Sequence, residues 1–242
     1  MEKNQSLHAF VKEELMNQIK SNKYKHGEQF PTEYKLCKEF DVSRTTIRAA
    51  LQQLTQEGYL VRHQGKGTFV ADPKVSQSLT QTVKKYSDQV AMQGKQATTH
   101  LISIQVIPAN EFLQNVLEVS ANAPIQRIER TRGANGEPTQ YQISYIPWEV
   151  APGITKEHAE SSLYTSLKQQ FSVRIAKTTE NVEITLADER TSNYLKCKRD
   201  LPCFYLETIA LDTSGRRVEF SRSYFRGDKT NFIIERNYTE EQ

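Results

Sequence analysis

Two arginines, Arg130 and Arg132, stand two residues apart in a segment where apolar and polar residues alternate as they do in a β-strand. Side chains at positions i and i+2 of a strand point to the same face, so both guanidinium groups would lie on one surface. Neighbouring guanidinium groups repel each other unless an anion lies between them. The pair therefore indicates a site for an anionic ligand. The alternative is that each arginine pairs with a nearby acid, such as Glu129 or Glu137.

A second basic cluster lies in the first third of the chain, around the end of the tight turn 41–43. Guanidinium groups donate hydrogen bonds to guanine edges or phosphates, and threonine hydroxyls reach phosphates or the thymine side of the groove. A helix that starts with such residues after a tight turn is typical of a DNA recognition helix. The alternative is the solvated basic face of an ordinary helix. The polar residues of this cluster are Ser43, Arg44, Thr45, Thr46 and Arg48.

Three helices are expected to position the cluster. Apolar residues at helical spacing predict one helix over 6–21 and another after Ser43, which is placed to cap it. Pro31 and Thr32 open the helix between them. Gly58 ends the third helix, where the left-handed conformation suits a glycine.

A two-stranded ribbon is expected after these helices, from the segments 59–62 and 68–71. Glycines at its tip permit close approach to a groove, and a lysine between them adds positive charge. The order of helix, turn, helix and ribbon predicts a winged helix-turn-helix over residues 1–72. The tip consists of Gly65, Lys66 and Gly67.

The rest of the chain is expected to form a second domain, 82–242, after a polar linker at 73–81. Hairpin signals occur at 135–136 and at 212–215. Closely spaced hairpins predict an antiparallel sheet with helices, which makes the fold class α+β rather than doubly wound. The expected strands are 98–107, 125–133, 138–146, 173–185, 203–212 and 217–226, and the expected helices are 83–93, 109–119, 161–170 and 187–197.

The composition limits the classes of function. The 242 residues carry a net charge of +3, and all of the excess lies in residues 1–75, where 12 Lys and Arg stand against 9 Asp and Glu. That end would attract a phosphate backbone. No apolar run is long enough to span a membrane, no secretory signal is present, and three cysteines lack metal-type spacing, so we expect a cytoplasmic protein without a membrane partner. Scattered histidines and the absence of a nucleophile elbow argue against an enzyme, a metal or a cofactor.

The first domain resembles the winged helix-turn-helix of the GntR family of bacterial transcription regulators. Three blocks carry the resemblance, at 30–33, 42–48 and 65–70. It implies DNA contacts by the recognition helix and by the wing. Tyr34 replaces an arginine that often contacts DNA in this family. The resemblance therefore leaves one base contact open, but not DNA binding itself. The expected DNA-binding residues are Thr32, Tyr34, Ser43, Arg44, Thr45, Thr46, Arg48, Gly65, Lys66 and Gly67.

The segment 82–236 resembles the UTRA effector domain of the HutC subfamily. An Arg-x-Arg pair is followed in order by short blocks at 136–138, 145–147, 161–164 and 224–228. The resemblance implies a chorismate-lyase-like fold that binds a small molecule without converting it, and that supplies a dimer interface. In relatives that sense sugar phosphates, the matching positions hold the phosphate. These positions are Ser87, Arg130, Arg132, Ser162 and Tyr164.

Four further positions concern the sugar end of the ligand. Gln142 replaces a glutamate found in relatives that bind amino-sugar phosphates, whereas the glutamate matching Glu219 is retained. Phe225 lacks the hydroxyl of a family tyrosine, and Arg222 is expected to take a carboxylate or to pair with Glu219. These differences argue against assuming N-acetylglucosamine 6-phosphate, and a different sugar phosphate, such as a sugar–amine or sugar–amino acid conjugate, fits as well.

Taken together, the sequence predicts a ligand-responsive repressor that binds a roughly palindromic double-stranded DNA operator as a homodimer. A small phosphorylated sugar derivative would release it. Three alternatives stay open: the same regulator with an unphosphorylated carboxylate effector, an architectural DNA binder without an effector, and an enzyme with a DNA-targeting head. Activation in place of repression is also open.

Overall fold

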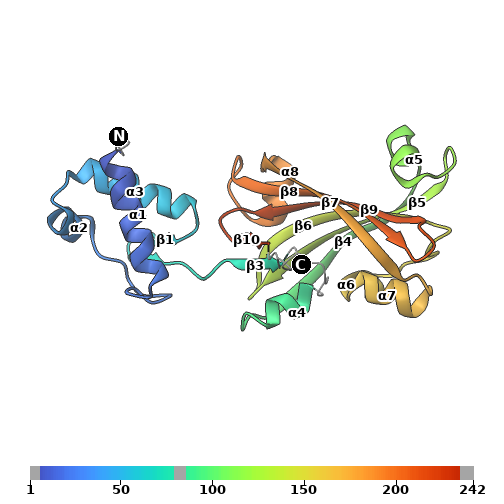
Figure 1. Ribbon diagram of the computed structural model, residues 1–242, viewed down its shortest axis with the longest axis horizontal. Helices are drawn as coiled ribbons and strands as arrows, with labels where there is room; N and C mark the ends of the chain where they lie inside the picture. The colour runs from blue at the N-terminus through green and yellow to red at the C-terminus, as the bar shows by residue number, and fades with distance from the viewer. Residues whose placement is uncertain (1–5, 79–85, 235–242) are drawn as a thin grey trace, which may run out of the picture. The chain divides into compact units, whose positions relative to one another are not determined.

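The computed structural model of the chain describes residues 6–78 and 86–234. The chain divides into two compact units, Met1–Lys74 and Val75–Gln242 (Figure 1). The first unit is mainly helical and the second is built on a large antiparallel sheet.

The first unit is a winged helix-turn-helix, as the sequence predicts. Its helices pack around a core of fully buried aliphatic side chains that includes Leu15, Leu36 and Ile47. Phe30, just before the second helix, and Val70 of the ribbon complete this core. The elements are α1 (Leu7–Lys20), α2 (Glu33–Phe40), α3 (Arg44–Gln56), β1 (Leu60–His63) and β2 (Gly67–Val70).

The second unit contains a six-stranded antiparallel sheet in the order β4-β5-β6-β9-β8-β7. Its strands are β4 (Ala97–Pro108), β5 (Pro124–Ala134), β6 (Glu137–Pro147), β7 (Ile175–Leu186), β8 (Pro202–Asp212) and β9 (Arg217–Arg226). Hairpins join β5 to β6 and β8 to β9. At the first of these, Asn135 and Gly136 both have positive φ, the backbone conformation that makes Asn-Gly a hairpin signal. The predicted α+β class is confirmed.

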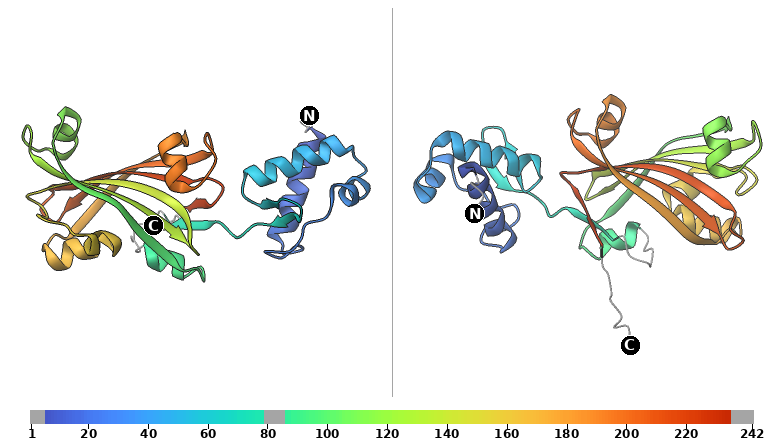
Figure 2. Two further views of the ribbon diagram at one scale, coloured as in Figure 1. Left: turned by 180° about the vertical axis from the view of Figure 1, so that it is seen from behind. Right: turned by 45° about the horizontal axis from the view of Figure 1, so that its top comes forward.

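Helices cover both faces of this sheet (Figures 1 and 2). On one face α6 (Lys156–Glu160) and α7 (Leu163–Gln170) pack against Ile128 and Ile146. On the other face α5 (Glu111–Leu117) packs near Ile125 and Phe220, and α8 (Glu189–Leu195) packs near Tyr141. Both sheet faces are therefore partly buried.

Three features differ from the sequence prediction. Residues 75–78, expected in the linker, form β3 (Val75–Ser78), which pairs in parallel with β10 (Thr230–Ile233). This pairing joins segments about 150 residues apart, so no local pattern announces it. Helix α6 is an additional element that the sequence analysis did not predict. The helix expected at 83–93 is present as α4 (Tyr86–Ala91), while residues 79–85 lie outside the described part of the chain.

Candidate functional site

The recognition helix α3 begins with the residues that the sequence singled out. The Ser43 hydroxyl caps the helix, accepting from the Thr46 backbone N–H at 3.2 Å, and it also lies 2.8 Å from the Thr46 hydroxyl. Arg44 and Arg48 project from the first two turns with side chains 76 % and 64 % exposed. Thr45 is exposed beside them. This face of α3 is therefore open to a partner.

One carboxylate on α2 holds both arginines in place. Glu33 accepts a hydrogen bond from Arg44 Nε at 2.7 Å, and its other oxygen lies 3.7 Å from Arg48 Nε. The Glu33 hydrogen bond raises the pKa of Arg44, which keeps the guanidinium charged. Glu33 follows the cap Thr32, whose hydroxyl accepts from the Lys35 N–H. The pairing orients the two guanidinium groups before any DNA is present.

The wing and the start of α2 place the remaining expected contacts at the surface. Gly65 and Gly67 have positive φ, and Lys66 between them is exposed. The Lys66 carbonyl accepts from the Gln29 side chain at 3.0 Å, which ties the tip to the body of the unit. Tyr34 is 68 % exposed and packs against Lys38, whose ammonium lies 4.6 Å from the ring centroid. The arginine of the family pattern is thus replaced by an aromatic side chain with a cation above it.

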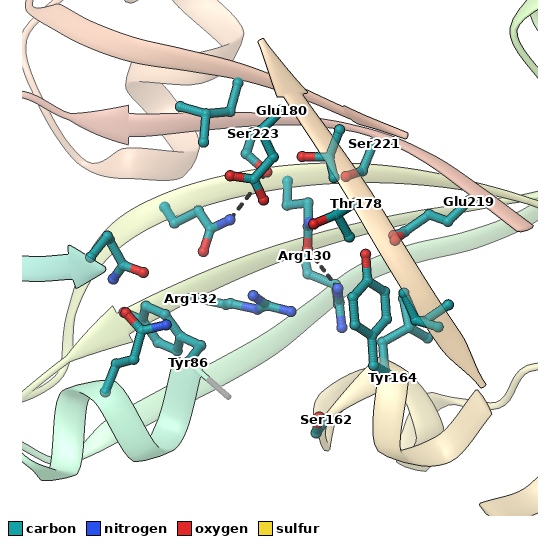
Figure 3. A pocket seen from close by; sticks show the side chains of 18 of the residues that line it. Tyr86, Arg130, Arg132, Ser162, Tyr164, Thr178, Glu180, Glu219, Ser221 and Ser223 are labelled. Carbon is teal, nitrogen blue, oxygen red and sulfur yellow. Dashed lines mark hydrogen bonds between the residues drawn. The ribbon is translucent and has the colours of Figure 1, made fainter. Parts of the chain in front are cut away.

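The second unit holds a cavity of about 680 Å³, which is in the range of small-molecule sites. Its floor is one face of the sheet, and α4 and the start of α7 form its sides (Figure 3). The labelled side chains in this view come from α4, β5, β7, β9 and the start of α7, which lie far apart in the sequence. The cavity is lined by polar and charged groups as well as apolar ones, so its chemistry is that of a binding pocket for a polar molecule.

Arg130 is almost fully buried in the pocket, at 1 % exposure, as is Glu219. Arg130 Nη1 donates to the Ala159 carbonyl at 2.8 Å and its Nη2 donates to Gln142 Oε1 at 2.5 Å. Within the described residues its Nε has no hydrogen-bond partner. Burial and the charge of Arg132 lower the pKa of Arg130 to about 9. At neutral pH Arg130 is therefore protonated, and its buried positive charge is not fully balanced by the groups around it. An anion beside it would supply that compensation.

Arg132 lies on the same face of β5, as the spacing predicts, and its guanidinium carbon is 5.5 Å from the centre of the Tyr86 ring. Among the described residues it has no hydrogen-bonded partner and no ion pair, so its donors are available to a ligand. Burial lowers the pKa of Arg132 as well. Tyr86 itself is anchored by its hydroxyl, 2.9 Å from the Thr139 hydroxyl.

The alternative in which these arginines pair with Glu129 or Glu137 is wrong. Glu129 faces the opposite side of the sheet, where Arg190 Nη2 donates to its two oxygens at 2.5 and 2.8 Å. Glu137 pairs with Lys229 at 2.8 Å. Alternation along β5 separates Glu129 from its neighbour Arg130, because adjacent strand residues point in opposite directions.

The amino end of α7 forms the second side of the charged region. Ser162 precedes the helix, and its side chain makes no capping hydrogen bond, so its hydroxyl and the free N–H groups of the first turn are available to an anion. Tyr164, in the first turn, points toward Glu219 (Figure 3). Burial and the Glu219 carboxylate raise the pKa of Tyr164 well above its usual value, so its hydroxyl stays a donor.

Most of the residues expected to hold an effector line this one cavity. Arg222 does not: alternation along β9 turns it to the opposite face, where its Nε donates to Glu207 at 3.1 Å rather than to Glu219. Ser87 is exposed on α4 beside the lining residue Tyr86, and its hydroxyl donates to Asp88 at 3.3 Å. The expected residues that line the cavity are Arg130, Arg132, Gln142, Ser162, Tyr164, Glu219 and Phe225.

Sequence reasoning missed several other lining residues. Ser221 and Ser223 lie between Glu219 and Phe225 on the same face of β9, so strict alternation could have found them. Thr178 and Glu180 line the cavity from β7, an edge strand of the sheet, and the sequence offered no signal of which cavity that strand borders. Desolvation raises the pKa of the Glu180 carboxyl. Gln77 of β3 also lines the cavity, although its segment was expected to be linker.

A winged helix-turn-helix joined to a domain with a polar, charged cavity defines a ligand-binding transcription regulator. The sequence profile "Bacterial regulatory proteins, gntR family" matches residues 7–70, and the "UTRA domain" profile matches residues 92–231. The chain belongs to the GntR family, with the UTRA effector domain of the HutC subfamily. It is a DNA-binding, non-enzymatic transcription regulator.

Relatives of full length support this assignment. The chain is 32% identical over 232 residues to the Probable fructoselysine utilization operon transcriptional repressor of Escherichia coli (strain K12), covering 96% of this chain and 95% of that protein. It is 30% identical over 223 residues to the HTH-type transcriptional repressor NagR of Bacillus subtilis (strain 168), covering 92% and 91%. The crystal structure of PhnF from Mycobacterium smegmatis matches with a TM-score of 0.68 and 28% identity, over 95% of this chain and 100% of that one.

Two further observations concern metal-binding clusters and membrane-spanning helices. Within residues 6–78 and 86–234, no group of three or more His, Cys, Asp or Glu side chains is arranged to hold a metal ion. No helix in the same ranges has the length and hydropathy to cross a bilayer.

Proposed function

We propose that the chain is a repressor whose effector is a small phosphorylated sugar or sugar–amine derivative bound in the pocket of the second unit. The observation that carries the proposal is the pair Arg130 and Arg132, which line one cavity. Within residues 6–78 and 86–234 neither forms an ion pair, and the buried Nε of Arg130 has no hydrogen-bond partner. Positive charge predominates around the cavity. Its basic residues are Arg130, Arg132, Lys168, Arg174 and Lys177, and its acidic residues are Glu180 and Glu219.

A phosphoryl group fits this arrangement better than a single carboxylate would. Three acceptor oxygens match the donors that converge from two elements: guanidinium groups on β5, and the Ser162 hydroxyl with free N–H groups at the start of α7. The carboxylates of Glu180 and Glu219, with Ser221 and Ser223, would accept from hydroxyl or ammonium groups of the rest of the ligand. The relation to a repressor of a fructoselysine utilization operon is consistent with a sugar–amino acid conjugate.

The proposed DNA-bound form is a homodimer on a two-fold operator, with one α3 in each half-site. Support for a second copy comes from β7, an edge strand of the sheet. Val182, Ile184 and Leu186 on one face of β7 are 43%, 78% and 57% exposed. A long apolar edge strand is a ready surface for pairing. A second copy of the chain would cover these side chains.

Thermal unfolding and operator binding test the proposal together. The purified protein is titrated with inorganic phosphate, hexose and hexosamine 6-phosphates, fructosamine-type 6-phosphates and the unphosphorylated sugars. At 100 times its dissociation constant, an effector adds about 2.7 kcal/mol to the stability of the unit that binds it. That corresponds to a rise in Tm of roughly 5–10 °C for a domain of this size.

The same compounds are then added to the protein bound to its operator. We expect the compound that raises Tm to weaken operator affinity by about 5–150-fold, a typical allosteric coupling. A shift with an unphosphorylated carboxylate and none with phosphates would refute the phosphate assignment. Tight operator binding that no compound alters would favour an architectural DNA binder, and turnover of a bound compound would favour an enzyme.

A further inference from the structure

One part of the cavity carries two amide groups with unused hydrogen-bonding atoms, and one of them, Gln140, is the cross-strand partner of Arg132. Gln77 on β3 is 9% exposed, and Gln140 on β6 is 3% exposed. Among the described residues, Gln77 Nε2 and Gln140 Oε1 have no hydrogen-bond partner. Both residues line the cavity. A buried donor and a buried acceptor without partners are each costly, and such groups in a native protein call for a ligand or an ordered water.

Pairing and ring contacts bring these two amides to the same part of the cavity. Gln140 lies opposite Phe225 in the β6–β9 pairing. The Phe225 ring packs against Phe232 of β10 with centroids 5.2 Å apart. Phe232 is in turn the partner of Gln77 in the β10–β3 pairing. Gln140 Nε2 is already engaged, donating to the Ser223 hydroxyl at 3.1 Å, so its oxygen is the atom left for a ligand.

The strand β3 is also the first element after the linker. The second unit begins at Val75, and Gln77 is two residues further along. Two contacts tie β3 firmly to the rest of the unit: the Val75 N–H donates to the Lys229 carbonyl at 2.7 Å, and the Gln93 side chain bonds both the N–H and the carbonyl of Ser76. A force on Gln77 would therefore act on the segment to which the DNA-binding unit is attached.

We propose that Gln77 and Gln140 together bind a hydroxyl group of the effector, and that Gln77 is the residue through which occupancy of the pocket acts on the linker. A hydroxyl is the one common group that donates and accepts at a single atom, so it can accept from Gln77 Nε2 while donating to Gln140 Oε1. This inference rests on the proposed function, because it places the hydroxyl on the same molecule whose phosphoryl group lies at Arg130 and Arg132. It assigns a sugar-recognising contact to β3.

The test compares Gln77→Met with the matched control Gln140→Met in the full chain. Both changes replace a buried amide by an unbranched apolar side chain of similar length, but only Gln77 lies on the strand that follows the linker. Circular dichroism and thermal unfolding establish that each variant is folded, and Gln77→Leu serves as a second variant. The probes are inorganic phosphate and the hexose 6-phosphate that gives the largest thermal shift with the wild-type chain.

Each variant is expected to bind that hexose 6-phosphate about 3–10-fold more weakly than the wild type, the loss of one neutral hydrogen bond. Inorganic phosphate lacks the sugar hydroxyl, so Gln77→Met is expected to leave its affinity unchanged. Gln140 is the cross-strand partner of Arg132, so only Gln77→Met serves for this comparison. At saturating hexose 6-phosphate, the operator affinity of the Gln140→Met protein should fall by the same factor as that of the wild type. Gln77→Met should lose most of the ligand response, measured as the ratio of its operator affinities with and without hexose 6-phosphate.

Two results would overturn the inference while leaving the proposed function intact. One is a Gln77→Met protein that binds hexose 6-phosphate as tightly as the wild type. The other is an equal ligand response at saturation in Gln77→Met and Gln140→Met. If no sugar phosphate binds the wild-type chain, the effector assignment itself fails, and the inference fails with it.

Discussion

Arg132 gives the sharpest test of the anion site, because the fold does not depend on it. Among the described residues Arg132 makes no hydrogen bond or ion pair, and its guanidinium lies 5.5 Å from the centroid of the Tyr86 ring. Such a cation–π contact is worth about 0.5–2 kcal/mol, and removing Arg132 also relieves its repulsion with Arg130. We therefore expect Arg132→Met to change the stability of the free protein by about 1 kcal/mol or less, a shift in Tm of about 2–4 °C.

The expected effect of Arg132→Met on ligand binding is much larger. A guanidinium that binds a phosphoryl group makes two charge-assisted hydrogen bonds, each worth about 1.5 kcal/mol or more. Losing both costs about 3 kcal/mol, which is roughly a 100-fold loss of affinity. Arg130 is a poorer choice, because its removal would also leave the Ala159 carbonyl and Gln142 Oε1 buried without their donor.

Calorimetric titration with the phosphorylated sugar found in the thermal screen measures this loss. Arg174→Met is the matched control, since Arg174 lines the same cavity but is exposed at its rim, and the change in charge is the same. Salt screens an exposed charge, so the control should lose only a few-fold. An Arg132→Met protein that binds within about three-fold of the wild type would refute the assignment. Equal losses in the two variants would mean that net charge, and not a specific contact, attracts the ligand.

Three further predictions concern other parts of the chain. Arg48→Ala should weaken operator binding by about 1–3 kcal/mol if Arg48 contacts a guanine, as measured by fluorescence anisotropy; unchanged affinity would remove it from the contact set. Burial raises the pKa of Glu129, but hydrogen bonding from Arg190 outweighs burial and lowers that pKa overall. The ionised Glu129 carboxylate therefore stabilises the fold above the ordinary pKa of 4.5, and this stabilisation is lost as pH falls below that value. Glu129→Gln should therefore cost about 1–3 kcal/mol at pH 7, by urea unfolding, and progressively less toward pH 3, and a gap that is independent of pH would contradict this account. Ile184→Lys should give a folded monomer in sedimentation experiments, whereas Thr179→Lys, on the opposite face of β7, should not; a dimeric Ile184→Lys protein would place the interface elsewhere.

Much of the architecture was predictable because its signals are local. The caps Thr32 and Ser43 accept hydrogen bonds from N–H groups three residues ahead, so they mark helix starts wherever they stand. Asn135-Gly136 adopts the positive φ values that a tight hairpin requires. Alternation alone placed Arg130 and Arg132 on one face. The resemblance to known regulators then supplied what these residues do.

The partners of several residues were not predictable from local patterns. Alternation along β9 already turns Arg222 away from the pocket in which it was expected, but only the pairing of β8 with β9 brings it beside Glu207. Glu129 seemed a natural partner for Arg130, but it lies across the sheet with Arg190 of α8. Choosing between such partners requires knowing which helix covers which face, and that is decided by packing of the whole unit.

The sequence by itself determined the two-domain organisation, the recognition helix and the paired guanidinium groups, since each depends on residues within a few positions of one another. The tertiary structure alone decided that Gln77 meets the cavity and that Glu180 reaches it from an edge strand. The pairing of β3 with β10 joins residues about 150 positions apart. Contacts of that kind form only when the sheet closes around its core, because their stability comes from burial shared across the unit and not from any single stretch of chain.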